Sequence, residues 1–223
     1  MSWIKKSIQE SSSLKDHYKL HHINIFIKDK FPKHLDFDRC VHLISRMLSP
    51  HLLKGVDIIY VGEFGFLDEM DFSALFKDGA IYLSNKFDDE DQVIEDLVHE
   101  IAHSNEYLYS DILYSDGAIM KEFLGKRKKL FYILKSENLS PPQSLQTNVE
   151  FDKDIDEYLY KTVGYPMLNA LCNGLFISAY STTSIREYFS TAFAEYFQGD
   201  KKSLKNTCPI VFSKIEELIQ LEG

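Results

Sequence analysis

The sequence predicts an α+β fold, in which a small mixed sheet is followed by a central helix and a helical C-terminal part. Three short segments rich in β-branched and aromatic residues predict the strands: 23–27, 56–61 and 79–84. The remainder has apolar residues at helical spacing and few glycines (10) and prolines (6), which favours helices. Since 44% of the 223 residues are apolar, the chain suits one sizeable core, and we expect a single domain over 21–223.

The N-terminal half is expected to alternate helices with these strands. The polar residues 1–20 predict a helix or a loosely held arm. Apolar residues recur at helical spacing from about 36 to 53 and predict a helix between the first two strands. An acidic stretch at 88–91 then begins a helix that runs through His103, because acidic side chains in a first turn are stabilised by the helix macrodipole.

The C-terminal half is expected to be helical apart from one long connection. Residues 118–135 and 184–198 predict helices, and Pro209 precedes a final amphipathic helix that ends near Leu221. The stretch from about 137 to 156 contains two adjacent prolines and many polar residues, so it predicts a long loop or lid.

Charge and cysteine content exclude some classes of function. The net charge of −9 at pH 7 disfavours nucleic acid as a partner, because neutralising phosphates requires clustered Lys and Arg. The one basic run, 126–129, is interpreted as a solvated helix face. The three cysteines (Cys40, Cys172 and Cys208) form no C-x-x-C pair, so neither a thiolate metal site nor a disulfide framework is predicted.

Apolar runs in the sequence are short. The first 20 residues lack the continuous apolar stretch of a signal peptide, and no run approaches the roughly 18 apolar residues of a membrane span. We therefore expect no membrane span, and either a cytoplasmic protein or one exported as an effector by a signal-independent route. The sequence leaves the oligomeric state open.

The pattern H-E-x-x-H occurs once, at His99, Glu100 and His103, on the predicted central helix. Residues four apart share a helix face, so both imidazoles can bind one ion, and Zn²⁺ is the ion that this pattern typically holds. Glu100 lies beside the first ligand, where it can act on a water that the metal activates without binding the metal itself. The sequence therefore predicts a one-zinc peptidase that acts on a peptide or protein substrate.

A third zinc ligand has to come from elsewhere in the chain. Glu106 lies one turn past His103, too close along the same helix to complete a tetrahedron, and Tyr109 stands where one common variant of the pattern has a histidine. Glu187 and Glu195 remain candidates on the helix over 184–198. Thr191 and Ala194 share the helix face of Glu187, with Ser190 at its edge, and these small side chains allow the close approach that a buried carboxylate ligand requires.

Residues 183–193 resemble the end of the catalytic domain of the anthrax lethal factor-like metallopeptidases, a family that includes endopeptidases cleaving between prolines. In that family a Tyr stands seven residues before a Glu, and two aromatics, a small residue and Ala-Phe follow; Tyr180 and Glu187 match this spacing. The resemblance implies a zincin-like fold of the gluzincin type, with Glu187 as third ligand and Tyr180 facing the reacting carbonyl. It covers roughly 56–110 and 175–220.

The resemblance also implies features around the site. Between His103 and Glu187 lie 83 residues, more than compact members have, so 118–170 is expected to be an insertion. Ser190 and Thr191 replace an Ala-Glu pair common in the family. The substrate is expected to add a strand to an exposed sheet edge at 79–84, and an ordinary internal strand is the alternative. That edge would present four residues to the substrate: Gly79, Ala80, Ile81 and Tyr82.

Other interpretations of these residues stay open. Glu187 also fits a capping box with Ser184, and Asp96 or Asp111 could orient the histidines. A repressor-clearing regulatory peptidase also uses H-E-x-x-H, although its usual asparagine-containing helix is not found. A non-catalytic interaction module that keeps zinc for structure is a further alternative, and it would not need Glu100.

Overall fold

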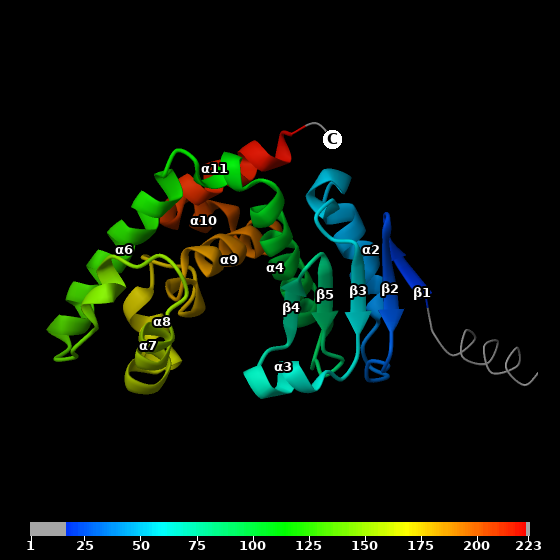
Figure 1. Cartoon of the computed structure of the whole chain (residues 1–223), viewed down its shortest axis with the longest axis horizontal. Coiled ribbons are helices and arrows are strands. Elements are labelled where there is room, and N and C mark those ends of the chain that lie inside the picture. Colours follow the sequence, from blue (N-terminus) through cyan, green and yellow to red (C-terminus); the bar gives the residue numbers. More distant parts are fainter. Residues whose placement is uncertain (1–16, 222–223) are drawn as a thin grey trace, which may run out of the picture. The chain divides into compact units, whose positions relative to one another are not determined.

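A five-stranded mixed sheet, in the order β1-β2-β3-β5-β4, forms the N-terminal part of the chain (Figure 1). In this computed structural model, which describes residues 17–221, the three central strands β2, β3 and β5 run parallel, and antiparallel β1 and β4 flank them. The strands are β1 (His17–Leu20), β2 (Ile23–Ile27), β3 (Ile58–Val61), β4 (Ala74–Lys77) and β5 (Ala80–Leu83). The predicted α+β class with a mixed sheet is therefore confirmed.

The described chain divides into two compact units, 17–105 and 106–221. The boundary falls inside a helix and at neither end of the predicted insertion 118–170, so the single domain over 21–223 stays a prediction. Most of the predicted polar arm 1–20 lies outside the described residues. Its last four residues form β1, whose backbone pairs with β2, and are therefore a sheet strand.

Helices of the first unit are α2 (Phe37–Met47), η1 (Pro50–Leu53), α3 (Gly65–Met70) and α4 (Glu90–Leu108). The helix predicted over 36–53 starts as expected, because Asp36 caps it by accepting a hydrogen bond from the Arg39 amide. It ends early, and a separate 3-10 turn follows. Pro50 disfavours the helical conformation at Ser49, which is extended (φ −66°, ψ 147°).

A tight hairpin joins β4 and β5. Asp78 and Gly79 both have positive φ (50° and 80°), as a type I′ turn requires. The sequence prediction contained β5 but missed β4, although Asp-Gly between two short apolar runs is a strong hairpin signal. As a result β5 is an internal strand, and β4 forms one edge of the sheet.

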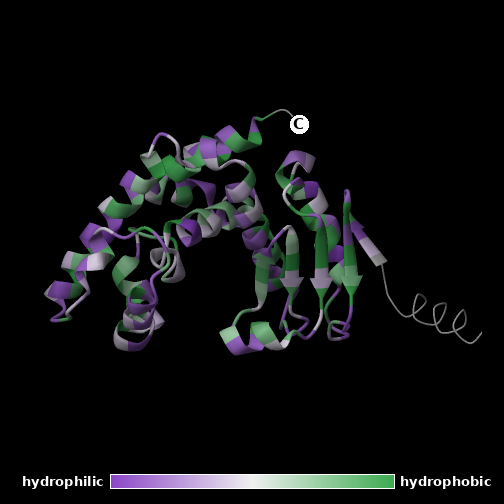
Figure 2. Cartoon of the chain, in the orientation of Figure 1, coloured by the Kyte–Doolittle hydropathy of each residue, from purple (hydrophilic) through white to green (hydrophobic). Residues whose placement is uncertain are grey.

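The core of the first unit is built from buried residues of the central strands, α2 and α4. Figure 2 shows the apolar residues gathered along these strands. Side chains that are fully buried alternate along the strands: Ile23, Ile25, Ile59, Val61, Ile81 and Leu83. On α4 the loop at Gly55 approaches closely, because a Cβ there would lie 2.8 Å from the carbonyl oxygen of Ser104. This contact and the buried helix face hold α4 in place.

The second unit is helical. Its elements are α5 (Ser110–Tyr114), α6 (Ala118–Ser136), η2 (Gln143–Gln146), α7 (Lys153–Glu157), η3 (Tyr158–Val163), α8 (Tyr165–Cys172), η4 (Tyr180–Thr182), α9 (Ile185–Gln198), α10 (Lys201–Thr207) and α11 (Pro209–Ile219). The helices predicted over 118–135 and 184–198 correspond to α6 and α9. Helix α9 packs against α6, α10, α11 and η4, and so lies at the centre of this unit.

The basic run 126–129 is only half solvated, which corrects its interpretation as a solvated helix face. Lys128 and Lys129 are exposed, whereas Lys126 and Arg127 are 8% and 0% exposed. Lys126 donates to the carbonyl oxygens of Leu175 and Thr207, and Arg127 donates to three other carbonyls. Carbonyl oxygens thus replace the water that these cations lose on burial.

All three cysteines are buried and free, so no disulfide framework exists. Within residues 17–221, no helix combines the length and apolar character needed to cross a membrane.

Candidate metal centre

His99 and His103 lie on one face of α4, as their spacing predicts. Their ring centroids are 5.0 Å apart, and the two rings are nearly perpendicular, at 81°. His103 is 8% exposed and His99 is half-buried, so the pair is neither freely solvated nor sealed off. Apolar neighbours on the opposite face of α4 anchor the helix and thereby both imidazoles: Val93, Leu97, Val98 and Ile101.

The imidazoles of His99 and His103 and the carboxylate of Glu187 form a group that could hold a metal ion. Each residue offers one ligand atom, and these atoms all lie within 4.8 Å of one another. Two imidazole nitrogens and one carboxylate oxygen are a donor set that catalytic zinc sites use, in which a fourth position stays open. The donors present therefore fit a zinc ion.

Glu187 lies in the first turn of α9. The Ser184 hydroxyl accepts a hydrogen bond from the Glu187 amide at 3.1 Å, so half of the predicted capping box is formed. This bond uses the backbone of Glu187 and not its carboxylate. The Ser190 hydroxyl contacts the carboxylate oxygen Oε2 at 3.4 Å. Capping and metal binding by Glu187 are thus compatible.

Glu195, the rival third ligand, serves a different purpose two turns further along α9. Its Oε1 accepts a hydrogen bond from the Asp200 amide at 2.9 Å, where the chain leaves α9 and enters α10. Gly199 makes room for this, since a Cβ there would overlap the Glu195 carboxylate. The group that could hold a metal ion includes Glu187 and not Glu195.

Glu100 lies on α4 between the two histidines and is 8% exposed. Its Oε2 accepts a hydrogen bond from the backbone amide of Phe76 at 2.5 Å. Phe76 belongs to β4, which pairs with β5 on one side only. The amide that reaches Glu100 therefore belongs to the side of β4 that has no partner strand. Phe76 was not among the residues that the sequence singled out, because β4 itself was missed.

The expectation that 79–84 forms an exposed sheet edge is wrong. Strand β5 pairs with β3 on one side and β4 on the other, so the backbone of Ala80, Ile81 and Tyr82 has no free edge for a substrate. Gly79 lies in the turn before β5, and its carbonyl accepts a hydrogen bond from the Asp57 amide. Tyr82 instead stacks on Tyr60, with ring centroids 5.5 Å apart. The alternative of an internal strand holds, and the available edge on this side of the sheet is β4.

Tyr180 begins η4, just before α9, and is half-buried. Arg127 holds this turn by donating to the carbonyls of Thr182 (2.8 Å) and Thr183 (2.7 Å). Burial lowers the pKa of Arg127 to about 10, and the charge of Asp152 opposes that shift. The role of Tyr180 stays a prediction, but the turn that carries it is firmly held.

Of the two carboxylates suggested as partners for the histidines, Asp96 is the better placed. It lies one turn before His99 on α4. Burial raises the pKa of Asp96, while a hydrogen bond with Ser73 and the charge of His99 act in the opposite direction. Asp96 therefore lies near His99, and its role in orienting this imidazole stays a prediction. Asp111 is exposed.

Comparison with known proteins gives no relative: no family model, no curated protein and no solved structure matches the chain.

Proposed function

We propose that the chain is a zinc-dependent endopeptidase with a zincin-like catalytic fold. The observation that carries this proposal is the group formed by His99, His103 and Glu187, with Glu100 next to the first ligand in the sequence. Two histidines and a carboxylate leave one coordination position for the reaction, whereas structural zinc sites are closed by four protein ligands. A half-buried ligand set with an acidic neighbour supports catalysis more than a structural role.

The protein residues have distinct tasks in this proposal. Zinc, when bound, supplies a lowered pKa for water and polarises the carbonyl that it contacts. Glu100 accepts the proton of the attacking water and later delivers it to the leaving amine. Tyr180 donates its hydroxyl hydrogen to the oxygen that becomes negative, an interaction that is stronger in the transition state than in the substrate.

The edge of β4 supports a corrected site for the substrate backbone. An extended peptide can pair with an exposed strand, and pockets beside that strand then select side chains. The hydrogen bond from the Phe76 amide to Glu100 indicates that this edge and the proposed general base lie next to each other. A peptide paired along Ala74–Lys77 would bring its own backbone beside Glu100.

Glu100→Gln tests the proposal directly. We expect the variant to bind one zinc ion per chain, as the wild type does, and to hydrolyse a protein substrate such as casein roughly 10²- to 10⁴-fold more slowly, because amide cannot act as a base. Metal content by elemental analysis and the rate of peptide release are the measurements.

Glu95→Gln, an exposed residue one turn earlier on α4, is the matched control and should keep full activity. Hydrolysis by the Glu100 variant at the wild-type rate would contradict the proposed mechanism. A wild-type protein that binds zinc and cleaves nothing would favour the non-catalytic zinc module.

A further inference from the structure

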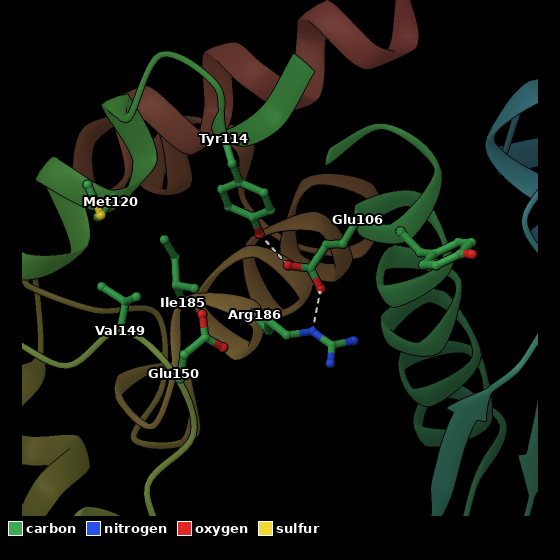
Figure 3. Close-up of a pocket in the computed structure, with 8 residues that line it drawn as sticks. Glu106, Tyr114, Met120, Val149, Glu150, Ile185 and Arg186 are labelled. Atoms are coloured by element: carbon green, nitrogen blue, oxygen red, sulfur yellow. Dashed lines mark hydrogen bonds and ion pairs between the residues drawn. The ribbon is translucent and has the colours of Figure 1, made fainter. Parts of the chain in front are cut away.

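A cavity of about 500 Å³ lies in the second unit (Figure 3). Some of its lining residues are close in the sequence to the candidate metal ligands. It is bounded by the end of α4, by α5, by the starts of α6 and α9, and by the segment at 149–150. The lining residues are Glu106, Tyr107, Tyr114, Met120, Val149, Glu150, Ile185 and Arg186.

This cavity is attached to the two helices that carry the metal ligands. Glu106 follows His103 by three residues on α4 and therefore lies on the same helix face as both histidines. Arg186 immediately precedes Glu187 at the start of α9. A peptide bound for cleavage at the metal would therefore have a side chain within reach of this cavity.

Two charged residues of the lining, Glu106 and Arg186, largely neutralise each other. Glu106 is 5% exposed and accepts a hydrogen bond from the Tyr114 hydroxyl. The Arg186 Nε lies 3.5 Å from the other oxygen of the Glu106 carboxylate. Figure 3 shows both contacts converging on Glu106. Three other residues of the lining are apolar and face the cavity: Met120, Val149 and Ile185.

One negative charge in the lining is left over. Two carboxylates and one guanidinium line the cavity, and Arg186 pairs with Glu106, which leaves Glu150. Glu150 is exposed, and among the described residues its carboxylate has no hydrogen bond or ion pair. Burial and the Glu106 carboxylate raise the pKa of Tyr114, and the Glu150 charge adds to this effect, so that charge acts on the cavity.

We propose that this cavity binds a lysine or arginine side chain of the substrate peptide, with the cation at Glu150 and the apolar stem along Met120, Val149 and Ile185. The occupant's identity as a substrate rests on the proposed peptidase function. Long basic side chains bury their methylene groups on apolar surface and keep the charged end at the rim, which is the arrangement of groups in this cavity. A purely apolar side chain would leave Glu150 unpaired.

The test measures binding separately from cleavage. The zinc-loaded Glu100→Gln protein is titrated calorimetrically with pairs of peptides that carry either lysine or norleucine at one position, and the position is moved along the peptide. Norleucine keeps the apolar stem and lacks the charge. We expect lysine to be preferred about fivefold at one position, as a solvent-accessible ion pair provides.

Adding Glu150→Gln should abolish this preference, whereas Glu137→Gln, an exposed glutamate at the end of α6 outside the cavity, should leave it intact. Norleucine binding as tightly as lysine at every position, or a preference that survives Glu150→Gln, would overturn the proposal. Casein hydrolysis by the wild type without any lysine preference would leave the peptidase standing and remove the basic pocket. A Glu150-dependent preference for lysine in a protein whose wild type hydrolyses nothing would support the basic pocket and contradict the peptidase function.

Discussion

Two glutamates on α9 show how position decides what a carboxylate does. Glu187 and Glu195 lie on the same helix, and each follows a tyrosine by seven residues. Glu187 has its amide capped by Ser184, and its carboxylate belongs to the group with His99 and His103. Glu195 accepts a hydrogen bond from the amide of Asp200. The side chains are identical, so their functions differ because of their neighbours alone.

We predict that Glu187→Ala weakens zinc binding by more than roughly 100-fold, because losing a ligand costs more than losing an outer-shell partner. Glu195→Ala should leave zinc affinity unchanged and lower the free energy of unfolding by about 1 kcal/mol, as loss of one capping hydrogen bond does. Competition with a chelating dye gives the affinities, and urea unfolding gives the stabilities. Weaker zinc binding in the Glu195 variant alone would move the ligand assignment to that residue.

At the scale of elements, α6 is part of the framework of the second unit. It falls in the segment that was expected to be an insertion, yet its Arg127 is fully buried and donates to Asn148, Thr182 and Thr183. Its guanidinium also lies 4.7 Å from the centre of the Phe123 ring. The Arg127 side chain therefore connects α6 to the backbone at Asn148 and to the turn that carries Tyr180.

Arg127→Met should lower the free energy of unfolding by about 3 kcal/mol or more, because three buried carbonyls lose a charged donor at once. Lys128→Met is the matched control: its side chain is exposed on the same helix, and a change within about 0.5 kcal/mol is expected. Chemical denaturation of both variants, followed by circular dichroism, measures the difference. Equal stability of the two would show that the Arg127 hydrogen bonds contribute little.

At the scale of the whole molecule, we expect metal binding to be linked to folding. The ligands come from α4 and α9, which are far apart in the sequence, so an unfolded chain does not hold them together. A ligand that binds only the folded state stabilises it according to its concentration relative to its Kd. The chain is therefore expected to be more stable with zinc than without.

Zinc at a hundred times its Kd should stabilise the protein by about 2.7 kcal/mol, which raises the Tm by roughly 5–10 °C for a chain of this size. Calorimetry of the chelator-treated protein, with and without added zinc, measures the shift. His103→Ala should lose it. The same Tm with and without zinc, or an equal shift in His103→Ala, would contradict a metal held by these residues.

Local pattern was sufficient for several features. The strand at 23–27 and the helices α6 and α9 follow from residue type and periodicity, which depend on neighbours along the chain. The spacing of His99 and His103 on one helix likewise identifies a candidate metal site from local sequence alone, since residues four apart share a helix face. The burial of Lys126 and Arg127 had no such signal, because helical periodicity does not show which carbonyls will meet a basic side chain.

The sequence by itself determined the α+β class, the main helices and the two histidines, because these depend on contacts between residues near one another in the chain. Only the tertiary structure decided that 79–84 is internal, that β4 is the edge beside Glu100, and that Glu187 rather than Glu195 joins the histidines. Strand order and the approach of distant carboxylates depend on how separate elements pack, and packing is a property of the folded chain as a whole.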